Sequence, residues 1–150
     1  MQNKLPEPLV ITRTLHAPVA SVWRALSDIT TLKKWMPFFP DFKAEVGFET
    51  RFMLGASPDR QYEHICHVTE AEAEKKLTYS WRYEGYPGDA YVTFELRPEG
   101  EETHLTLTYR ITEMFPLGNP DFDIKNAAYG WNHIVDSLKE FVESPVSTRR

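Results

Sequence analysis

One short segment holds the side chains best suited to metal binding or nucleophilic attack: His64, Cys66 and His67. Imidazole nitrogens and thiolates ligate zinc, and a thiolate is also a nucleophile. Successive side chains of a β-strand point to opposite faces, so His64 and Cys66 share one face while His67 takes the other. Because a zinc site needs three or four converging ligands, we expect no metal here. We interpret Cys66 as a small buried residue. His64 is either a satisfied strand histidine, or a hydrogen-bonding group or general base in a pocket.

Aromatic residues make up 13% of the chain, a high share. We expect most of these rings to be buried in the interior of the protein. Residues 76–84, 90–97 and 103–112 alternate apolar and polar side chains, which is typical of antiparallel strands covered on one face. The rings of these segments therefore point toward one interior. Ligand pockets are mostly apolar with a few placed polar groups, a role that tyrosine hydroxyls could fill. The alternative is that the rings pack against one another as core.

The C-terminal region predicts one long amphipathic helix. From residue 124 the apolar residues recur with the i, i+3, i+4, i+7 spacing of a helix face. Asn119 is an N-cap candidate and Pro120 suits the first helical position, whereas Ser144-Pro145 ends the helix. Carboxylates of this region, Asp121 among them, are expected on the solvated surface.

Small residues stand at the centre of the apolar face of this helix, at Ala127, Ala128 and Gly130. A core helix usually carries Leu or Ile at such positions. We therefore expect a void where the helix meets the sheet, with residues 35–39 near its mouth. The predicted ligand contacts are Trp35, Phe38, Phe39, Phe52, His64, Tyr79, Trp81, Tyr83, Phe94, Leu107, Tyr109, Ala127, Ala128, Trp131 and Val135.

The elements that must position these residues follow a simple order. Pro18 opens a first short helix, and Asp28 can cap a second one over residues 29–35. Strand-like segments occupy residues 9–16, 42–46, 48–54, 61–70, 76–84, 90–97 and 103–112. The order predicts an α+β fold in which a curved, seven-stranded antiparallel sheet grips the long C-terminal helix, with two short helices after the first strand. At 150 residues the chain is expected to form one domain.

Composition excludes several classes of partner. The net charge of −5, with basic residues clustered only in pairs, argues against binding to nucleic acid or to an anionic membrane. A single cysteine fits a reducing compartment. The N-terminal residues lack the apolar stretch of a signal peptide, and no apolar run approaches the roughly 18 residues that span a bilayer. We therefore expect a cytoplasmic protein, and the sequence shows no cofactor motif.

Several local motifs occur in a familiar order: Ala17-Pro18 with Val22-Trp23, then Leu32 with Trp35, the strand at 77–81, the strand at 103–109, and Gly130-Trp131. This order resembles the START-like superfamily, also called SRPBCC, and within it the branch similar to the Hsp90 ATPase activator homologue. The resemblance covers about residues 9–143. It implies a helix-grip fold with a deep cavity between the sheet and the long helix.

The sequence is compatible with three functions. The first is the binding of a small hydrophobic or aromatic molecule, such as a lipid, polyketide or phenolic metabolite, in the cavity. The second is an enzyme acting on such a ligand in the same cavity, with cyclase-, hydrolase- or dehydratase-like activity and His64 or Tyr109 as acid or base. The third is a chaperone-ATPase or stress co-regulator that acts by protein contact, which the branch name suggests. Exposed aromatic residues at Trp35, Phe38, Phe39 and Phe42 could serve such a partner or a homodimer.

Overall fold

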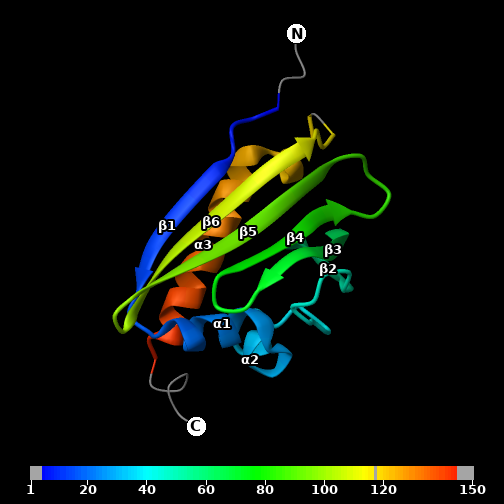
Figure 1. Ribbon diagram of the computed structural model, residues 1–150. Helices are drawn as coiled ribbons and strands as arrows, with labels where there is room; N and C mark the ends of the chain where they lie inside the picture. The colour runs from blue at the N-terminus through cyan, green and yellow to red at the C-terminus, as the bar shows by residue number, and fades with distance from the viewer. Residues whose placement is uncertain (1–4, 117, 145–150) are drawn as a thin grey trace.

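The computed structural model describes residues 5–116 and 118–144 (Figure 1). This part of the chain forms six strands, three α-helices and one short 3₁₀ helix. In chain order they are β1 (Leu9–Leu15), α1 (Val19–Ser27), α2 (Ile29–Trp35), β2 (Glu49–Ser57), β3 (Arg60–Glu72), β4 (Lys76–Tyr83), β5 (Asp89–Glu99), β6 (Glu102–Glu113), η1 (Pro120–Phe122) and α3 (Ile124–Val142).

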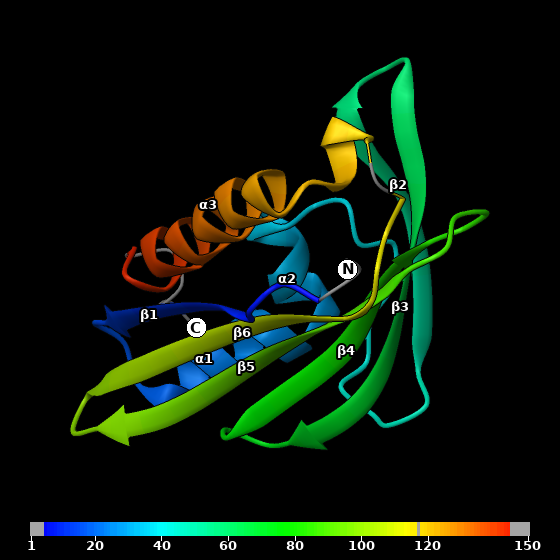
Figure 2. The same cartoon turned by 90° about the horizontal axis from the view of Figure 1, so that it is seen from above.

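The strands form one antiparallel sheet in the order β1-β6-β5-β4-β3-β2. Figure 2 shows that the sheet curves, with β2 and β3 turning up toward η1, and that the helices lie on its inner side. Leu77, Phe94 and Leu107 stand in register across β4, β5 and β6 and are fully buried beneath the helices. The predicted α+β helix-grip architecture is therefore confirmed.

The predicted strand at residues 42–46 is wrong, and the sheet has six strands rather than seven. Phe42 is buried, but the Asp41 carboxylate accepts a hydrogen bond from its backbone N–H at 2.8 Å. Farther along, the Phe48 N–H closes a turn onto the Glu45 carbonyl at 3.0 Å, with Gly47 at a φ of 98°. These local bonds and the left-handed glycine turn the chain before it can pair as a strand.

The two short helices begin where the sequence predicts. Pro18 occupies the N-cap of α1, and its carbonyl accepts the first helical hydrogen bonds. Asp28 ends α1 and caps α2, because its carboxylate accepts bonds from the Thr31 N–H at 3.0 Å and from the Thr31 hydroxyl at 2.8 Å. One aspartate with an extended backbone thus separates the two helices.

The long helix α3 begins later than its predicted cap. Asn119 caps the 3₁₀ helix η1 instead, and Asp123 caps α3 by accepting a hydrogen bond from the Lys125 N–H at 3.0 Å. Trp131, Val135, Leu138 and Val142 form the buried face of α3, as their helical spacing predicts. The predicted end at Ser144-Pro145 lies partly outside the described residues, and the helix ends at Val142.

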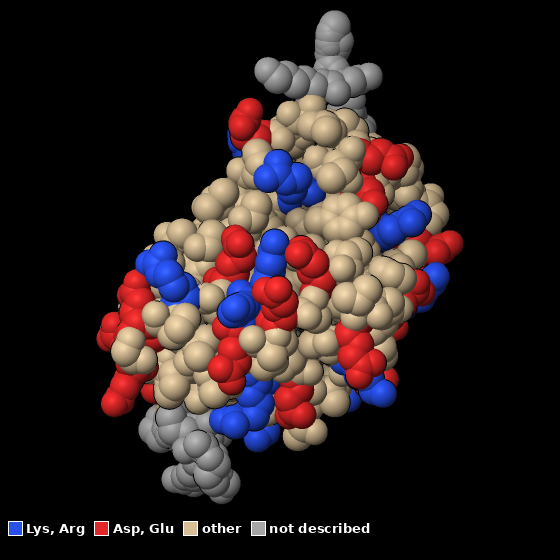
Figure 3. Space-filling model, in the orientation of Figure 1, with Lys and Arg blue, Asp and Glu red and all other residues tan. Residues whose placement is uncertain are grey.

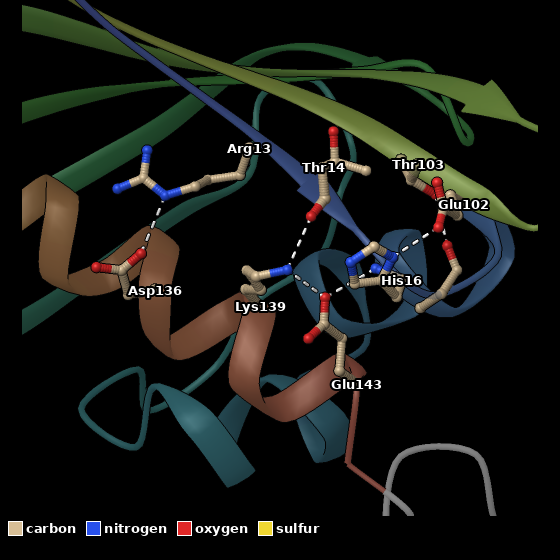
Figure 4. A network of polar contacts seen from close by, with 9 residues as sticks. Arg13, Thr14, His16, Glu102, Thr103, Asp136, Lys139 and Glu143 are labelled. Atoms are coloured by element: carbon tan, nitrogen blue, oxygen red, sulfur yellow. Dashed lines mark hydrogen bonds and ion pairs between the residues drawn. The ribbon is translucent and has the colours of Figure 1, made fainter.

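A polar network fastens the C-terminal half of α3 to β1 (Figure 4). Arg13 donates to the Asp136 carboxylate at 3.0 Å, and Lys139 donates to the Thr14 carbonyl at 2.9 Å. Glu143 accepts bonds from Lys139 and from the backbone N–H of His16. These contacts all lie toward the C-terminal end of α3, so the N-terminal half of the helix depends on other contacts to hold it over the sheet.

Acidic and basic side chains are interspersed on the face shown in Figure 3, over the strands that face the viewer in Figure 1. Charged side chains of the strands also pair across short distances, such as Arg97 with Glu99 in β5 at 2.7 Å. The face therefore presents no broad area of one sign. Among the residues that the structure describes, no helix has both the length and the apolar character required to cross a bilayer.

Candidate functional site

A pocket of about 530 Å³ lies between the N-terminal half of α3, η1 and the upturned end of β2, β3 and β4. Its volume falls within the range of about 300–1,000 Å³ that is usual for small-molecule sites. The lining residues are Leu54, Gly55, Arg60, Tyr62, His64, Trp81, Tyr83, Tyr109, Phe115, Asp121, Phe122, Asp123, Asn126, Ala127, Tyr129, Gly130, Trp131 and Ile134.

Small residues of α3 leave this space open. Ala127 and Gly130 both line the pocket, one helical turn apart. A Cβ atom placed on Gly130 would meet no atom within 4 Å, so no neighbour requires a glycine there. A glycine inside a helix lowers stability by roughly 0.5–1 kcal/mol relative to alanine. Because no steric contact requires Gly130, its presence needs another explanation. An open pocket wall provides one.

Aromatic rings form the floor and the sides. The Trp131 ring packs edge-on against Trp81, with centroids 4.8 Å apart, and lies 5.8 Å from the Tyr109 ring. On the other side, Phe122 of η1 lies 4.8 Å from Tyr83 and 5.0 Å from Tyr62. A flat, largely apolar ligand in this pocket would therefore contact the faces and edges of aromatic rings on most sides.

The imidazole of His64 lines the pocket and is buried, with 6% of the residue's surface exposed. Its ring stacks on Phe52 at 5.1 Å and meets Trp81 and Tyr83 edge-on at 5.0 and 4.8 Å. Burial among these rings lowers the pKa of His64 from 6.5 to about 4. The imidazole is therefore neutral at physiological pH.

Two tyrosine hydroxyls of the lining are also held in their neutral form. Burial raises the pKa of Tyr83 to about 12 and raises the pKa of Tyr109 further. Both hydroxyls keep their protons at physiological pH and can donate or accept a hydrogen bond. The deep part of the pocket thus offers polar atoms without a formal charge.

Two charged residues of the pocket rim, Arg60 and Asp121, neutralise each other, while the exposed Asp123 caps α3. Arg60, at the turn between β2 and β3, forms a two-pronged ion pair with Asp121 of η1, one bond of which measures 3.1 Å. The Tyr62 hydroxyl donates to the same carboxylate at 2.6 Å. The hydrogen bonds from Arg60 and Tyr62 lower the pKa of Asp121. This network ties the β2–β3 hairpin to η1 along one edge of the pocket.

The predicted ligand contacts divide into two groups. Six of them line the pocket: His64, Trp81, Tyr83, Tyr109, Ala127 and Trp131. Nine of them do not line it: Phe39, Phe52, Tyr79, Phe94, Leu107 and Val135 are buried core residues, and Trp35, Phe38 and Ala128 are half-buried. Trp35 is held by a 2.9 Å hydrogen bond from its indole N–H to the Ala25 carbonyl. Their role in binding a ligand stays a prediction.

The predicted ligand contacts omit twelve of the eighteen lining residues, which come from the β2–β3 hairpin, the segment after β6, η1 and α3. Tyr62 could have been found, because it lies two residues before His64 on the same strand and therefore shares its face. Phe115 and Phe122 follow no periodic pattern. Arg60 and Asp121 are 61 residues apart in sequence, and only the curvature of the sheet brings them together.

The other chemically active side chains lie apart from the pocket or are inert. Cys66 is 1% exposed, and burial raises the pKa of its thiol, so it is not a reactive thiolate. His67 lies on the opposite, exposed side of β3, as strand alternation predicts. No group of three or more His, Cys, Asp or Glu residues in the described part of the chain is arranged to hold a metal ion.

The aromatic surface patch predicted at residues 35–42 is wrong in part. Phe39 and Phe42 are 0% and 2% exposed, because they pack with Phe52 and Tyr79 in an aromatic cluster of the core. That segment therefore supplies core packing rather than a continuous exposed apolar surface.

Comparison with known proteins assigns the family. The sequence model of the family described as "Activator of Hsp90 ATPase homolog 1-like protein" matches residues 16–143. The chain belongs to this family. The family assignment confirms the resemblance drawn from the order of the motifs, and it fits the helix-grip arrangement of α3 on the curved sheet. A search of curated proteins found no match to this chain.

Solved structures share the fold of this family member. Protein MLL2253 of Mesorhizobium loti is 24% identical with a TM-score of 0.73, and CV1439 of Chromobacterium violaceum is 24% identical with a TM-score of 0.75. Each comparison covers 91% of this chain and 97% of the other. DynU16, from the dynemicin biosynthetic locus, is 22% identical with a TM-score of 0.74, and the match covers 93% of this chain and 48% of DynU16.

Proposed function

We propose that this protein binds a small, flat, hydrophobic or aromatic molecule in the pocket between α3 and the sheet. The observation that carries the proposal is the open space above Gly130, in a helix whose buried face continues through Trp131, Val135 and Leu138. No neighbouring atom requires a glycine at this position, which lies opposite a wall of aromatic rings. A bound ligand that occupies this space would account for the glycine.

The chemistry of the lining favours binding over acid–base catalysis. A general base is most effective when its pKa lies near the working pH, whereas the pKa of His64 is about 4. The raised pKa of Tyr109 likewise makes its hydroxyl a weak acid. The polar atoms of the pocket are therefore suited to orienting a ligand by hydrogen bonds.

The other functional predictions have less support from the structure. The role as a chaperone-ATPase co-regulator is suggested by the family description alone, and the burial of Phe39 and Phe42 removes part of the surface first assigned to it. A homodimer and a cytoplasmic location stay predictions.

Binding can be tested with 2-methylnaphthalene, a flat bicyclic probe of suitable size. A ligand at one hundred times its Kd stabilises the folded state by about 2.7 kcal/mol, which for a domain of this size raises Tm by about 5–10 °C. We expect such a shift with the wild-type protein, and its loss in Gly130→Leu, whose side chain occupies the space.

The matched control is Glu140→Leu, which adds the same side chain to an exposed position of α3 away from the pocket. This variant should keep the shift. The proposal fails if flat aromatic probes leave Tm unchanged, or if Gly130→Leu folds and binds them as the wild type does.

A further inference from the structure

The hydrogen bonding of His64 fixes which of its ring nitrogens carries the proton. Nδ1 lies 2.9 Å from the backbone carbonyl oxygen of Tyr62. A carbonyl oxygen can only accept, so Nδ1 must be the donor. Because the ring is neutral, Nε2 carries no proton and is an obligate acceptor.

The Nε2 atom is unpaired and reachable. Among the described residues no group donates a hydrogen bond to it, and the only buried side-chain polar atom without a partner is Oδ1 of Asp89. Nε2 is therefore not sealed in the core. Since His64 lines the pocket and its ring is enclosed by Phe52, Trp81 and Tyr83, the open edge of the imidazole faces the pocket.

We propose that His64 determines the specificity of the pocket, and that its Nε2 accepts a hydrogen bond from the hydroxyl of a neutral phenolic ligand. This inference rests on the proposed function and names the class of ligand. The aromatic walls select a flat ring, whereas the acceptor selects a ligand that carries a donor. A ligand without a donor would bury Nε2 unsatisfied, and one that offers only an acceptor would also be repelled.

The other polar groups of the lining agree with a neutral ligand. Arg60 and Asp121 are paired with each other, so neither is free to recognise a ligand charge without breaking that pair. The hydroxyls of Tyr83 and Tyr109 can serve as donor or acceptor and so do not select between ligands. His64 is the neutral lining side chain with a nitrogen that can only accept, whereas the indole N–H groups of Trp81 and Trp131 can only donate.

The test compares 2-naphthol with 2-methylnaphthalene, which differ by a hydroxyl in place of a methyl group, by calorimetry. The wild type should bind 2-naphthol about tenfold more tightly, the ratio expected when a buried acceptor is satisfied rather than left unpaired. His64→Phe keeps the ring packing and removes the acceptor, so the preference should disappear. His67→Phe makes the same change on the exposed side of β3, outside the pocket, and should keep the preference.

A second measurement needs no variant and so does not depend on folding of His64→Phe. In the wild type, the ¹⁵N resonance of the unprotonated His64 Nε2 should move when 2-naphthol binds and stay nearly unchanged with 2-methylnaphthalene. Equal affinity for the two probes, or a preference that survives in folded His64→Phe, would overturn the inference while leaving the binding function intact. Failure of both probes to bind would remove the proposed function itself.

Discussion

Replacing Gly130 tests directly whether the helix leaves a hollow over the sheet. Gly130→Ala adds one Cβ atom where the structure places no atom within 4 Å, so the methyl group meets no clash. The substitution also removes the conformational penalty of a glycine inside a helix, about 0.5–1 kcal/mol. We expect the free energy of unfolding to rise by that amount, and Tm by about 2–3 °C.

The assay is urea denaturation followed by circular dichroism, with the m-value as a check that the unfolding transition keeps its character. Gly130→Ala should keep the binding of 2-methylnaphthalene, since one methyl group fills a small part of about 530 Å³. Gly130→Leu should weaken binding at least tenfold without unfolding the protein. A loss of 1 kcal/mol or more in Gly130→Ala would refute the reasoning, because it would show that the space is filled.

Three further predictions follow from individual contacts. Because the pKa of His64 falls from 6.5 to about 4 on folding, stability should decline by about 3 kcal/mol as pH falls from about 6.5 to 4, and His64→Gln should flatten that decline in urea titrations. At pH values above 3.8, the ordinary pKa of an aspartate carboxyl, Asp121→Asn should lower the urea concentration at the midpoint of unfolding. Its difference from wild type should shrink as pH falls below that value, because the pKa of Asp121 is depressed by Arg60; an unchanged midpoint at pH 7 would contradict this. Gly88→Ala should cost about 1–3 kcal/mol in the same assay, since its Cβ would lie 2.2 Å from the Phe115 ring at a φ of 119°, and wild-type stability would contradict that contact.

Local chemistry explains why most of the fold could be predicted from the sequence. Asp28 caps α2 in the way its position before Ile29 predicts, and the alternation of residues 76–84 and 103–112 marks the inner face of β4 and β6. The prediction fails at residues 42–46, where Phe42 is apolar and buried without belonging to a strand. An alternating pattern reports burial, and it cannot show whether a neighbouring strand is available for pairing.

The pocket is harder to predict, because alternation assigns a side chain to a face of the sheet and not to a place along it. Leu77 and Tyr79 share the inner face of β4 with Trp81 and Tyr83, yet the first two lie in the packed core and the last two line the pocket. The division depends on the curvature of the sheet and on where α3 and η1 lie. Those are long-range properties that no local pattern of residues contains.

The central claim is that a flat aromatic molecule occupies the space between α3 and the ring wall of the sheet. Intermolecular nuclear Overhauser effects from bound 2-methylnaphthalene test it most directly. We predict contacts from the probe to the Ala127 methyl group and to the indole rings of Trp81 and Trp131. Contacts confined to exposed residues, or to the core cluster around Phe39, would contradict the account.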